Sequence, residues 1–189
     1  RALLQDRRGD LWVGTTLGLG KMVDGRFVNF SQRDGLPHND IRALLEDREG
    51  RLWIGTQDGL SRYDGRSFVN YSAADGLASR GVLSLAEDDR GRIWIGSENG
   101  LTLYDGETFQ SLSSRDGLPG NRVESLLFDA SSSLWIGTRD GLMRYKARSS
   151  PPPILSTDVI AGYRRGPVDR IEVPVTRALL AFELLGISF

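Results

Sequence analysis

The acidic residues that recur ahead of a tryptophan are the first candidates for chemistry in this sequence. They are Asp6, Asp47, Asp88 and Asp129. Glycoside hydrolysis uses two carboxylates that face one another across the scissile bond. Acids that occupy the same turn of every repeat are instead spread around the repeat array. We therefore interpret these four aspartates as turn-forming residues with no catalytic role.

Other reactive groups are scarce. His38 is the only histidine, so it has no partner for a metal site or a catalytic triad, and we interpret it as a solvated loop residue. The absence of cysteine excludes disulfides, thiol catalysis and cysteine metal sites. The run Asp88-Asp89-Arg90-Gly91 lacks the alternating oxygen ligands of a calcium loop. The sequence thus predicts no catalytic residue, no metal site and no cofactor.

The composition of the chain limits the classes of partner that it can bind. The 189 residues are 39% hydrophobic, which is enough for a buried core, and the formal net charge is −1. Basic and acidic residues are mixed along the chain, so we expect no nucleic-acid partner. No apolar run approaches the length of a membrane span, and we expect no membrane contact by this segment itself. The chain opens at Arg1 inside a repeat, which we interpret as a piece of a longer protein.

A strict sequence repeat determines where any functional residues of this chain lie. The four tryptophans, Trp12, Trp53, Trp94 and Trp135, lie 41 residues apart. A fixed period of this length is typical of β-propellers and related arrays. The sequence therefore predicts an all-β fold of propeller blades.

One full period predicts four short strands in an antiparallel meander. Alternating or continuous apolar residues predict strands A to D at 41–47, 51–56, 60–63 and 68–72. Asp47 and Gly50 suit the A–B turn, Gly59 closes the B–C turn, and Asp64-Gly65 predicts a two-residue hairpin between C and D. The segment 73–78 then crosses to the next strand A at Val82.

The tryptophans admit two interpretations. Aromatic faces suit pyranose rings, so the tryptophans could form sugar-stacking platforms. Each one, however, lies mid-strand between apolar neighbours, which favours packing between blades. A glycine follows each tryptophan two residues later and is expected to leave room for a bulky neighbour. These glycines are Gly14, Gly55, Gly96 and Gly137.

The repeat boundaries fall at about 1–41, 42–82, 83–123 and 124–146. The fourth repeat runs into three prolines, Pro151 to Pro153, which cannot join a strand ladder, so we expect it to lack its outer strand. We interpret 147–153 as a proline-rich linker and 154–189 as a truncated β-sandwich segment. Within it, 154–160 and 170–173 read as strands. The run 178–185 fits either helix or strand, and we prefer strand.

Alternating strand direction brings the B–C turns and the D–A crossovers to one rim, here called the crossover rim. The A–B and C–D turns form the opposite turn rim, with stereotyped Asp/Gly turns. Because variable polar residues on a fixed scaffold make a binding face, we expect ligand contacts on the crossover rim. Asn39 and Asn121 could instead only cap their own loops. The candidates are His38, Asn39, Gln57, Arg80, Glu98, Asn99, Asn121 and Arg139.

These motifs resemble the two-component regulator propeller repeat, which here reads Asp34-Gly35-Leu36-Pro37, Glu46-Asp47, Leu52-Trp53-Ile54-Gly55-Thr56 and Gly59-Leu60. The tail resembles the start of the triple-tyrosine (Y_Y_Y) sandwich domain, although only Tyr163 is present. The resemblance implies a ring of about seven blades. It also implies the periplasmic part of an inner-membrane sensor, either a histidine kinase, a hybrid regulator or a diguanylate cyclase. The resemblance further implies that the ligand is a small molecule or an oligosaccharide, and that the full-length sensor is a homodimer.

Two hypotheses result. The first is a non-catalytic, extracytoplasmic ligand-sensing propeller of a bacterial signal-transduction sensor, with carbohydrate fragments as ligands. The alternative is a propeller scaffold for protein–protein interaction or dimerisation without a small ligand, and an enzyme is least favoured. In either case we expect an open arc whose 141–145 edge is unpaired. A strand from upstream would fill that edge, and the isolated chain should associate.

Overall fold

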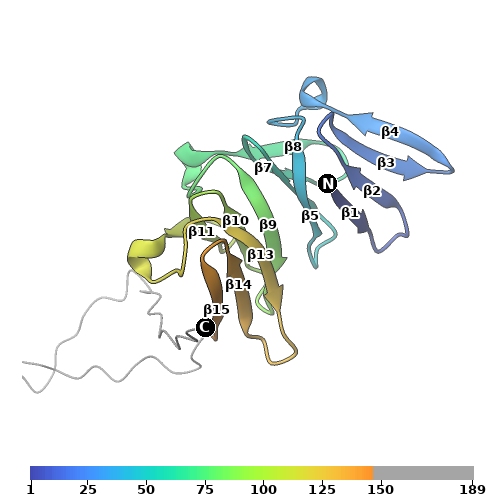
Figure 1. Ribbon diagram of the computed structural model, residues 1–189. Helices are drawn as coiled ribbons and strands as arrows, with labels where there is room; N and C mark the ends of the chain where they lie inside the picture. The colour runs from blue at the N-terminus through green and yellow to red at the C-terminus, as the bar shows by residue number, and fades with distance from the viewer. Residues whose placement is uncertain (147–189) are drawn as a thin grey trace, which may run out of the picture.

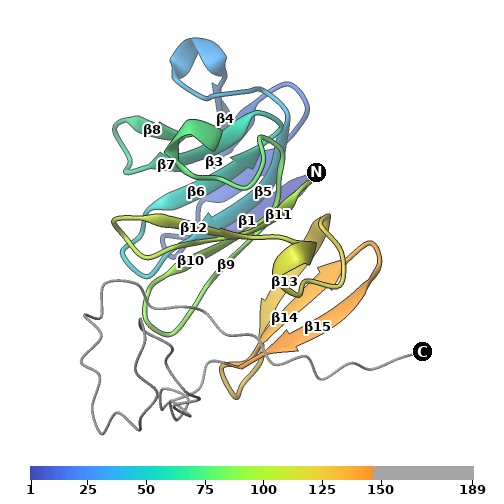
Figure 2. The ribbon, with the colours of Figure 1, turned by 90° about the vertical axis from the view of Figure 1, so that its left-hand side faces the viewer.

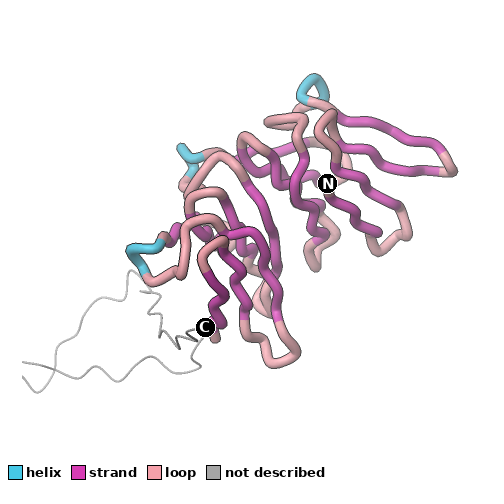
Figure 3. Tube along the Cα trace, viewed as in Figure 1, coloured by secondary structure: helices cyan, strands magenta, loops and turns pink. Residues whose placement is uncertain are grey.

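A computed structural model describes residues 1–146. The predicted linker and sandwich segment, 147–189, lie outside the described residues. Figure 1 shows strands almost throughout residues 1–146, and Figure 3 shows short helical turns between some of them.

The strands form four separate antiparallel sheets, which we call blades 1 to 4. Within each blade the strands follow one another in sequence order, as a meander does. Blade 4 has three strands within residues 1–146. The bounds are β1 Ala2–Gln5, β2 Leu11–Gly14, β3 Leu19–Val23, β4 Arg26–Phe30, β5 Ile41–Glu46, β6 Leu52–Thr56, β7 Gly59–Tyr63, β8 Phe68–Tyr71, β9 Val82–Glu87, β10 Ile93–Ser97, β11 Gly100–Tyr104, β12 Phe109–Leu112, β13 Val123–Phe128, β14 Leu134–Thr138 and β15 Gly141–Tyr145.

The blades stand side by side along an arc, with blade 1 and blade 4 at its two ends (Figures 1 and 2). The first strands, β1, β5, β9 and β13, are neighbours from blade to blade. Within the described part, β15 pairs only with β14, and no strand of blade 1 pairs with blade 4. These four blades therefore form an open arc, as predicted.

The A–B turn aspartate organises each blade. In blade 2 the Asp47 Oδ1 accepts hydrogen bonds from the backbone N–H groups of Glu49 (3.0 Å) and Arg51 (2.9 Å). Its Oδ2 accepts one from Trp53 Nε1 at 2.7 Å. One carboxylate thus satisfies both the turn and the indole N–H, which a buried tryptophan otherwise leaves unpaired. The Asp–Trp bond recurs in blades 1, 3 and 4 at 2.9, 3.2 and 3.0 Å.

The tryptophans pack between blades, as the second interpretation predicts. Trp12 clusters with Leu52 and Ile54 of blade 2, and the same arrangement recurs at the next two interfaces. Trp53 is 0% exposed. Each of these three tryptophans also contacts a tyrosine of the following blade, with ring centroids 5.6 to 6.0 Å apart. Trp135, on the last described blade, is half-buried.

The glycine after each tryptophan is a point of close approach. A Cβ at Gly14 would lie 2.6 Å from Ile41 Cγ2, and one at Gly55 would lie 2.6 Å from Val82 Cγ1. At Gly96 the corresponding distance to Val123 Cγ1 is 2.7 Å. Because all three are too short for real carbon atoms, only glycine lets the first residue of the next blade fit here.

The C–D hairpin prediction is wrong for blade 2. Tyr63 pairs with Phe68, so the loop has four residues rather than two. Asp64 Oδ1 accepts hydrogen bonds from the backbone N–H groups of Arg66 and Ser67, and this side-chain cap replaces the tight turn. Among the C–D loops within residues 1–146, only that of blade 1 is a two-residue turn, where Asp24 and Gly25 both take positive φ (49° and 75°).

The crossovers contain short 3₁₀ helices that the sequence analysis does not predict: η1 Gln32–Asp34, η2 Ala73–Asp75 and η3 Ser114–Asp116. In η1 the Ser31 and Asp34 side chains form a reciprocal capping box, and Gly35 ends the turn at φ 111°. The same pattern recurs in η2 and η3. The crossovers therefore enter each new blade with a fixed geometry.

Candidate functional site

Backbone hydrogen bonds join the B–C turns to the crossovers. The N–H of Gln57 donates to Asp40 O (3.0 Å), and that of Glu98 donates to Gly81 O (2.9 Å). The N–H of Arg139 donates to Arg122 O at 3.1 Å. The two kinds of segment thus lie on one rim, where the sequence analysis puts them.

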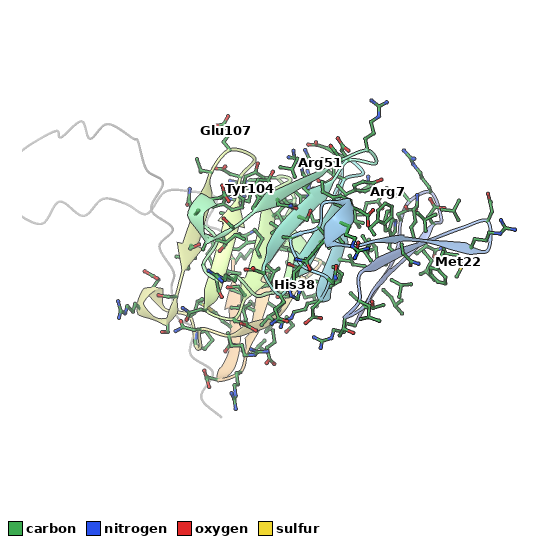
Figure 4. All side chains as sticks on the ribbon, turned by 90° about the horizontal axis from the view of Figure 1, so that it is seen from above. Arg7, Met22, His38, Arg51, Tyr104 and Glu107 are labelled. Carbon is green, nitrogen blue, oxygen red and sulfur yellow. The ribbon has the colours of Figure 1, made fainter. Side chains whose placement is uncertain are left out.

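Three of the predicted rim residues fasten their own loops. Asn39 Oδ1 accepts from the backbone N–H of Gln32 at 2.8 Å, and Asn121 Oδ1 accepts from that of Ser114 at 2.6 Å. His38 Nδ1 accepts from the backbone N–H of Asp40 at 3.0 Å. Figure 4 labels His38 on the crossover before blade 2. These side chains have a loop-capping function whether or not they touch a ligand.

Four more candidates are not drawn into one site. Arg80 forms a loose ion pair with Asp58 at 3.8 Å, and both side chains are exposed. Gln57 and Arg139 take part through their backbones, as above. Asn99 lies in an exposed turn. The rim therefore does not gather all of the predicted residues around one ligand position.

Glu98 differs, because it joins a group of charges at the inner side of the arc. Its Oε1 lies 2.7 Å from Arg42 Nη1 of blade 2 and 3.7 Å from Arg122 Nη1 at the start of blade 4. Gly81 lies directly beneath the Glu98 carboxylate, where a Cβ would come within 2.6 Å of Glu98 Cδ. A side chain at position 81 would displace Glu98 from this place.

The charges continue in both directions as an alternating row, here called the ion-pair row. Arg42 Nε lies 3.4 Å from Asp40 Oδ2, and Arg1 Nη1 lies 3.2 Å from Asp40 Oδ1. At the other end Arg122 Nε donates to Glu124 Oε1 at 3.0 Å. The row spans all four blades and consists of Arg1, Asp40, Arg42, Glu98, Arg122 and Glu124.

Burial is greatest inside the ion-pair row, at Asp40 and Arg42, whereas Arg1 at one end of the row is 50% exposed. The side chains of Asp40 and Arg42 are only 10% and 16% exposed, whereas Glu98 and Arg122 are both 42% exposed. Asp40 Oδ1 is buried and, apart from the ion pair with Arg1, accepts no hydrogen bond from the described residues. The Asp40–Arg42 pair inside the row is thus buried, whereas Arg1 on one side and Glu98, Arg122 and Glu124 on the other are exposed to solvent.

A hollow of about 310 Å³ lies against this row. Its lining includes repeat-equivalent positions of strand A in the four blades. These positions hold different residue types, unlike the constant Trp and Gly positions of the same repeats. The lining residues are Arg1, Arg42, Leu83, Arg122 and Glu124.

Of this group the sequence analysis identifies only Glu98. Arg42 and Glu124 were detectable, since they share the 41-residue period and the less apolar face of strand A. The contacts of Arg42 and Arg122 with Glu98 were not detectable, because they depend on the curvature that brings three blades together. Within residues 1–146, no group of three metal-ligating side chains converges, and no helix is long and apolar enough to cross a membrane.

Comparison with protein families identifies the repeat. The family described as "Two component regulator propeller" matches residues 1–16, 35–58, 76–99 and 117–140. Over these four repeats the chain belongs to the two-component regulator propeller family. A search of the curated proteins finds no match.

Solved structures share the fold. One is the extracellular domain of a hybrid two-component system from B. thetaiotaomicron, with a TM-score of 0.70 at 23% identity over 77% of this chain. The present chain spans only 21% of that protein. PorZ, a surface component of the type-IX secretion system of Porphyromonas gingivalis, gives a TM-score of 0.60 at 19% identity, with 76% of this chain and 25% of that one covered.

Enzymes with the same fold also match. Virginiamycin B lyase from Staphylococcus aureus gives a TM-score of 0.60 at 12% identity, with 78% of this chain and 55% of that one covered. At such low identities the likeness establishes the propeller fold and does not assign an activity.

Proposed function

We propose that this chain is the ligand-sensing propeller of an extracytoplasmic bacterial sensor, and that it binds its ligand on the crossover rim without catalysing a reaction. The family and the extracellular domain of the hybrid two-component system support the sensor class. The inner-membrane setting, the periplasmic location and a homodimeric whole protein belong to the same proposal.

The observation that carries the proposal is the contrast between constant and variable positions. The A–B turn, the tryptophan and the following glycine are the same in nearly every repeat, and their polar groups are satisfied within the blade. On the crossover rim, by contrast, equivalent positions hold different residue types from blade to blade, and some of them line the hollow. Variable polar groups on a rigid frame are the usual basis of recognition.

The non-catalytic assignment is supported by how the repeated acids are used. Each A–B turn aspartate is engaged by backbone N–H groups and by a tryptophan. Burial raises the pKa of Asp47, but hydrogen bonds from Trp53, Arg51 and the backbone outweigh this and hold the pKa below its ordinary value. A carboxylate held ionised and fully hydrogen-bonded is a poor proton donor.

Calorimetry on the full-length protein tests this proposal. A panel of neutral and acidic mono- and oligosaccharides should contain at least one ligand that binds with a dissociation constant in the micromolar to millimolar range. Binding should leave that ligand chemically unchanged on prolonged incubation. Turnover of the ligand, or no binding across the panel together with a tight protein partner, would favour the enzyme or scaffold alternatives.

A further inference from the structure

The hollow beside the ion-pair row presents more hydrogen-bond donors than acceptors. The formal charges of the row cancel, with three arginines against three carboxylates. Among the described residues, Arg122 donates only through Nε, to Glu124, and its Nη1 is too far from Glu98 (3.7 Å) for a hydrogen bond. Arg42 uses Nε and Nη1. The outer guanidinium nitrogens therefore remain available on two arginines that line one hollow.

The exposed part of the row formed by Glu98, Arg122 and Glu124 is also easier to rearrange than the buried Asp40–Arg42 pair. Glu98 and Arg122 are both 42% exposed, and Glu124 is 55% exposed. Ion pairs between side chains this exposed contribute little to stability, because water screens them. A ligand anion that makes paired hydrogen bonds with a guanidinium can replace such a carboxylate at small cost.

We propose that this hollow binds the carboxylate of a small hydroxylated acid, of the uronic acid class, between Arg42 and Arg122. Glu98 holds the arginines in place when no ligand is bound and is displaced from Arg122 when the carboxylate enters. Glu124 accepts hydrogen bonds from ligand hydroxyls, and Leu83 contacts the apolar face of the ring. The hollow, about 310 Å³, has the volume for one such unit.

This inference rests on the proposed sensing function and adds the ligand's charge. It also gives binding a structural consequence. Arg42 belongs to blade 2, Glu98 to blade 3 and Arg122 to the start of blade 4, so exchange of the Glu98–Arg122 pair alters a contact between blades.

Calorimetry with glucuronate and glucose on the full-length protein tests the inference. Glucuronate should bind at least about tenfold more tightly than glucose, since a hydrogen bond to a charged group is worth that much. Arg122→Gln should weaken glucuronate binding at least about tenfold and leave glucose unchanged. Glu98→Gln should strengthen glucuronate binding a few-fold, because the competing charge is gone.

Arg115→Gln is the matched control, since Arg115 is exposed on η3 of the same rim and loses the same charge. It should leave both affinities unchanged. Arg122→Lys keeps the positive charge but not the planar guanidinium that can donate two parallel hydrogen bonds. It should therefore cause an intermediate loss of glucuronate affinity, and it provides a second test if Arg122→Gln unfolds.

Equal affinity for glucuronate and glucose, or no effect of either Arg122 variant, would overturn the inference and leave the sensing function standing. Failure of every acidic and neutral sugar to bind would overturn both. Glucuronate binding that Arg115→Gln weakens as much as Arg122→Gln would show a diffuse charge effect and overturn this site.

Discussion

The two rims of the arc use the same kinds of side chain for opposite purposes. On the turn rim, the aspartates and arginines form contacts that recur between blades. Arg7 Nη1 donates to Arg48 O (2.7 Å) and Arg48 Nη1 donates to Asp89 O (2.8 Å), one repeat apart. On the crossover rim, arginines and carboxylates form a row that does not repeat. The recurring contacts join successive blades in the same way, whereas the irregular row is the part on which the proposed ligand binding rests.

The largest expected loss of stability follows from removing one of the tryptophans that pack between blades. Trp53→Ala should lower the free energy of unfolding by about 3–5 kcal/mol, because it opens a cavity between blades 2 and 3 and leaves Asp47 without its indole partner. Urea unfolding of the full-length protein measures it. A loss below about 1 kcal/mol would mean that the tryptophan is not a core residue and would revive the sugar-stacking interpretation.

A methyl group at the close approach between blades should be nearly as harmful. Gly55→Ala should cost about 1–3 kcal/mol, because the new Cβ would lie 2.6 Å from Val82 Cγ1. Val82→Ala removes the obstructing carbon, so the double variant should be less destabilised than the sum of the two single variants. Strict additivity in thermal unfolding would contradict the contact.

Substitution of the A–B turn aspartate should lower the free energy of unfolding by a smaller amount, and that amount should depend on pH. Asp47→Asn should cost about 1–3 kcal/mol, because one orientation of the amide sets its N–H₂ against Trp53 Nε1 and the other against backbone N–H groups. Since the folded-state pKa of Asp47 is lowered, its contribution is complete above the unfolded pKa of about 3.9 and is lost as pH falls through the folded value.

Unfolding titrations between pH 7 and pH 2 check this sign. The wild-type protein should lose stability on acidification, and the Asp47→Asn variant should lose less. Asp6, Asp88 and Asp129 have lowered pKa values from the same kind of hydrogen bonds, so one substitution should flatten the profile only in part. Parallel profiles for the two proteins would contradict the role of Asp47.

The smallest effect should come from the crossover rim. Asn39→Ala removes an exposed hydrogen bond to the backbone of Gln32, which water can replace, so the loss should be about 0.5 kcal/mol or less. The same urea measurement checks it. A loss comparable to that of Trp53→Ala would erase the difference between the two rims.

The frame was largely predictable because its determinants are local and repeated. The 41-residue period of Trp12 to Trp135 fixed the strands, and the glycine two residues later indicated close packing. The sequence analysis did not use the Ser31–Asp34 capping box, although a serine three residues before an aspartate is a visible signal for it. The Asp64 loop was misjudged because an Asp-Gly pair favours a tight hairpin only when both residues take positive φ.

The charged site was predictable only in part, for a physical reason. Arg42 and Glu98 are 56 residues apart, and nothing in their local sequence pairs them. Their contact depends on how far each blade turns relative to the last, which packing of Trp53 and Val82 determines. Sequence reasoning identified the rim on which the row lies and one member of the row, Glu98, but the row itself follows from the curvature of the arc.

The close contacts between blades limit the ways in which such a chain can gain or lose residues. These contacts join Gly14 to Ile41, Gly55 to Val82 and Gly96 to Val123. Each glycine meets a residue at the same offset further along, so each contact links one repeat to its successor. Duplication or loss of one whole 41-residue unit leaves every remaining glycine opposite a matching aliphatic side chain. A shorter insertion separates the partners at one junction. Duplication or deletion of a complete 41-residue unit should therefore preserve these contacts, whereas a change of other length should disrupt one of them.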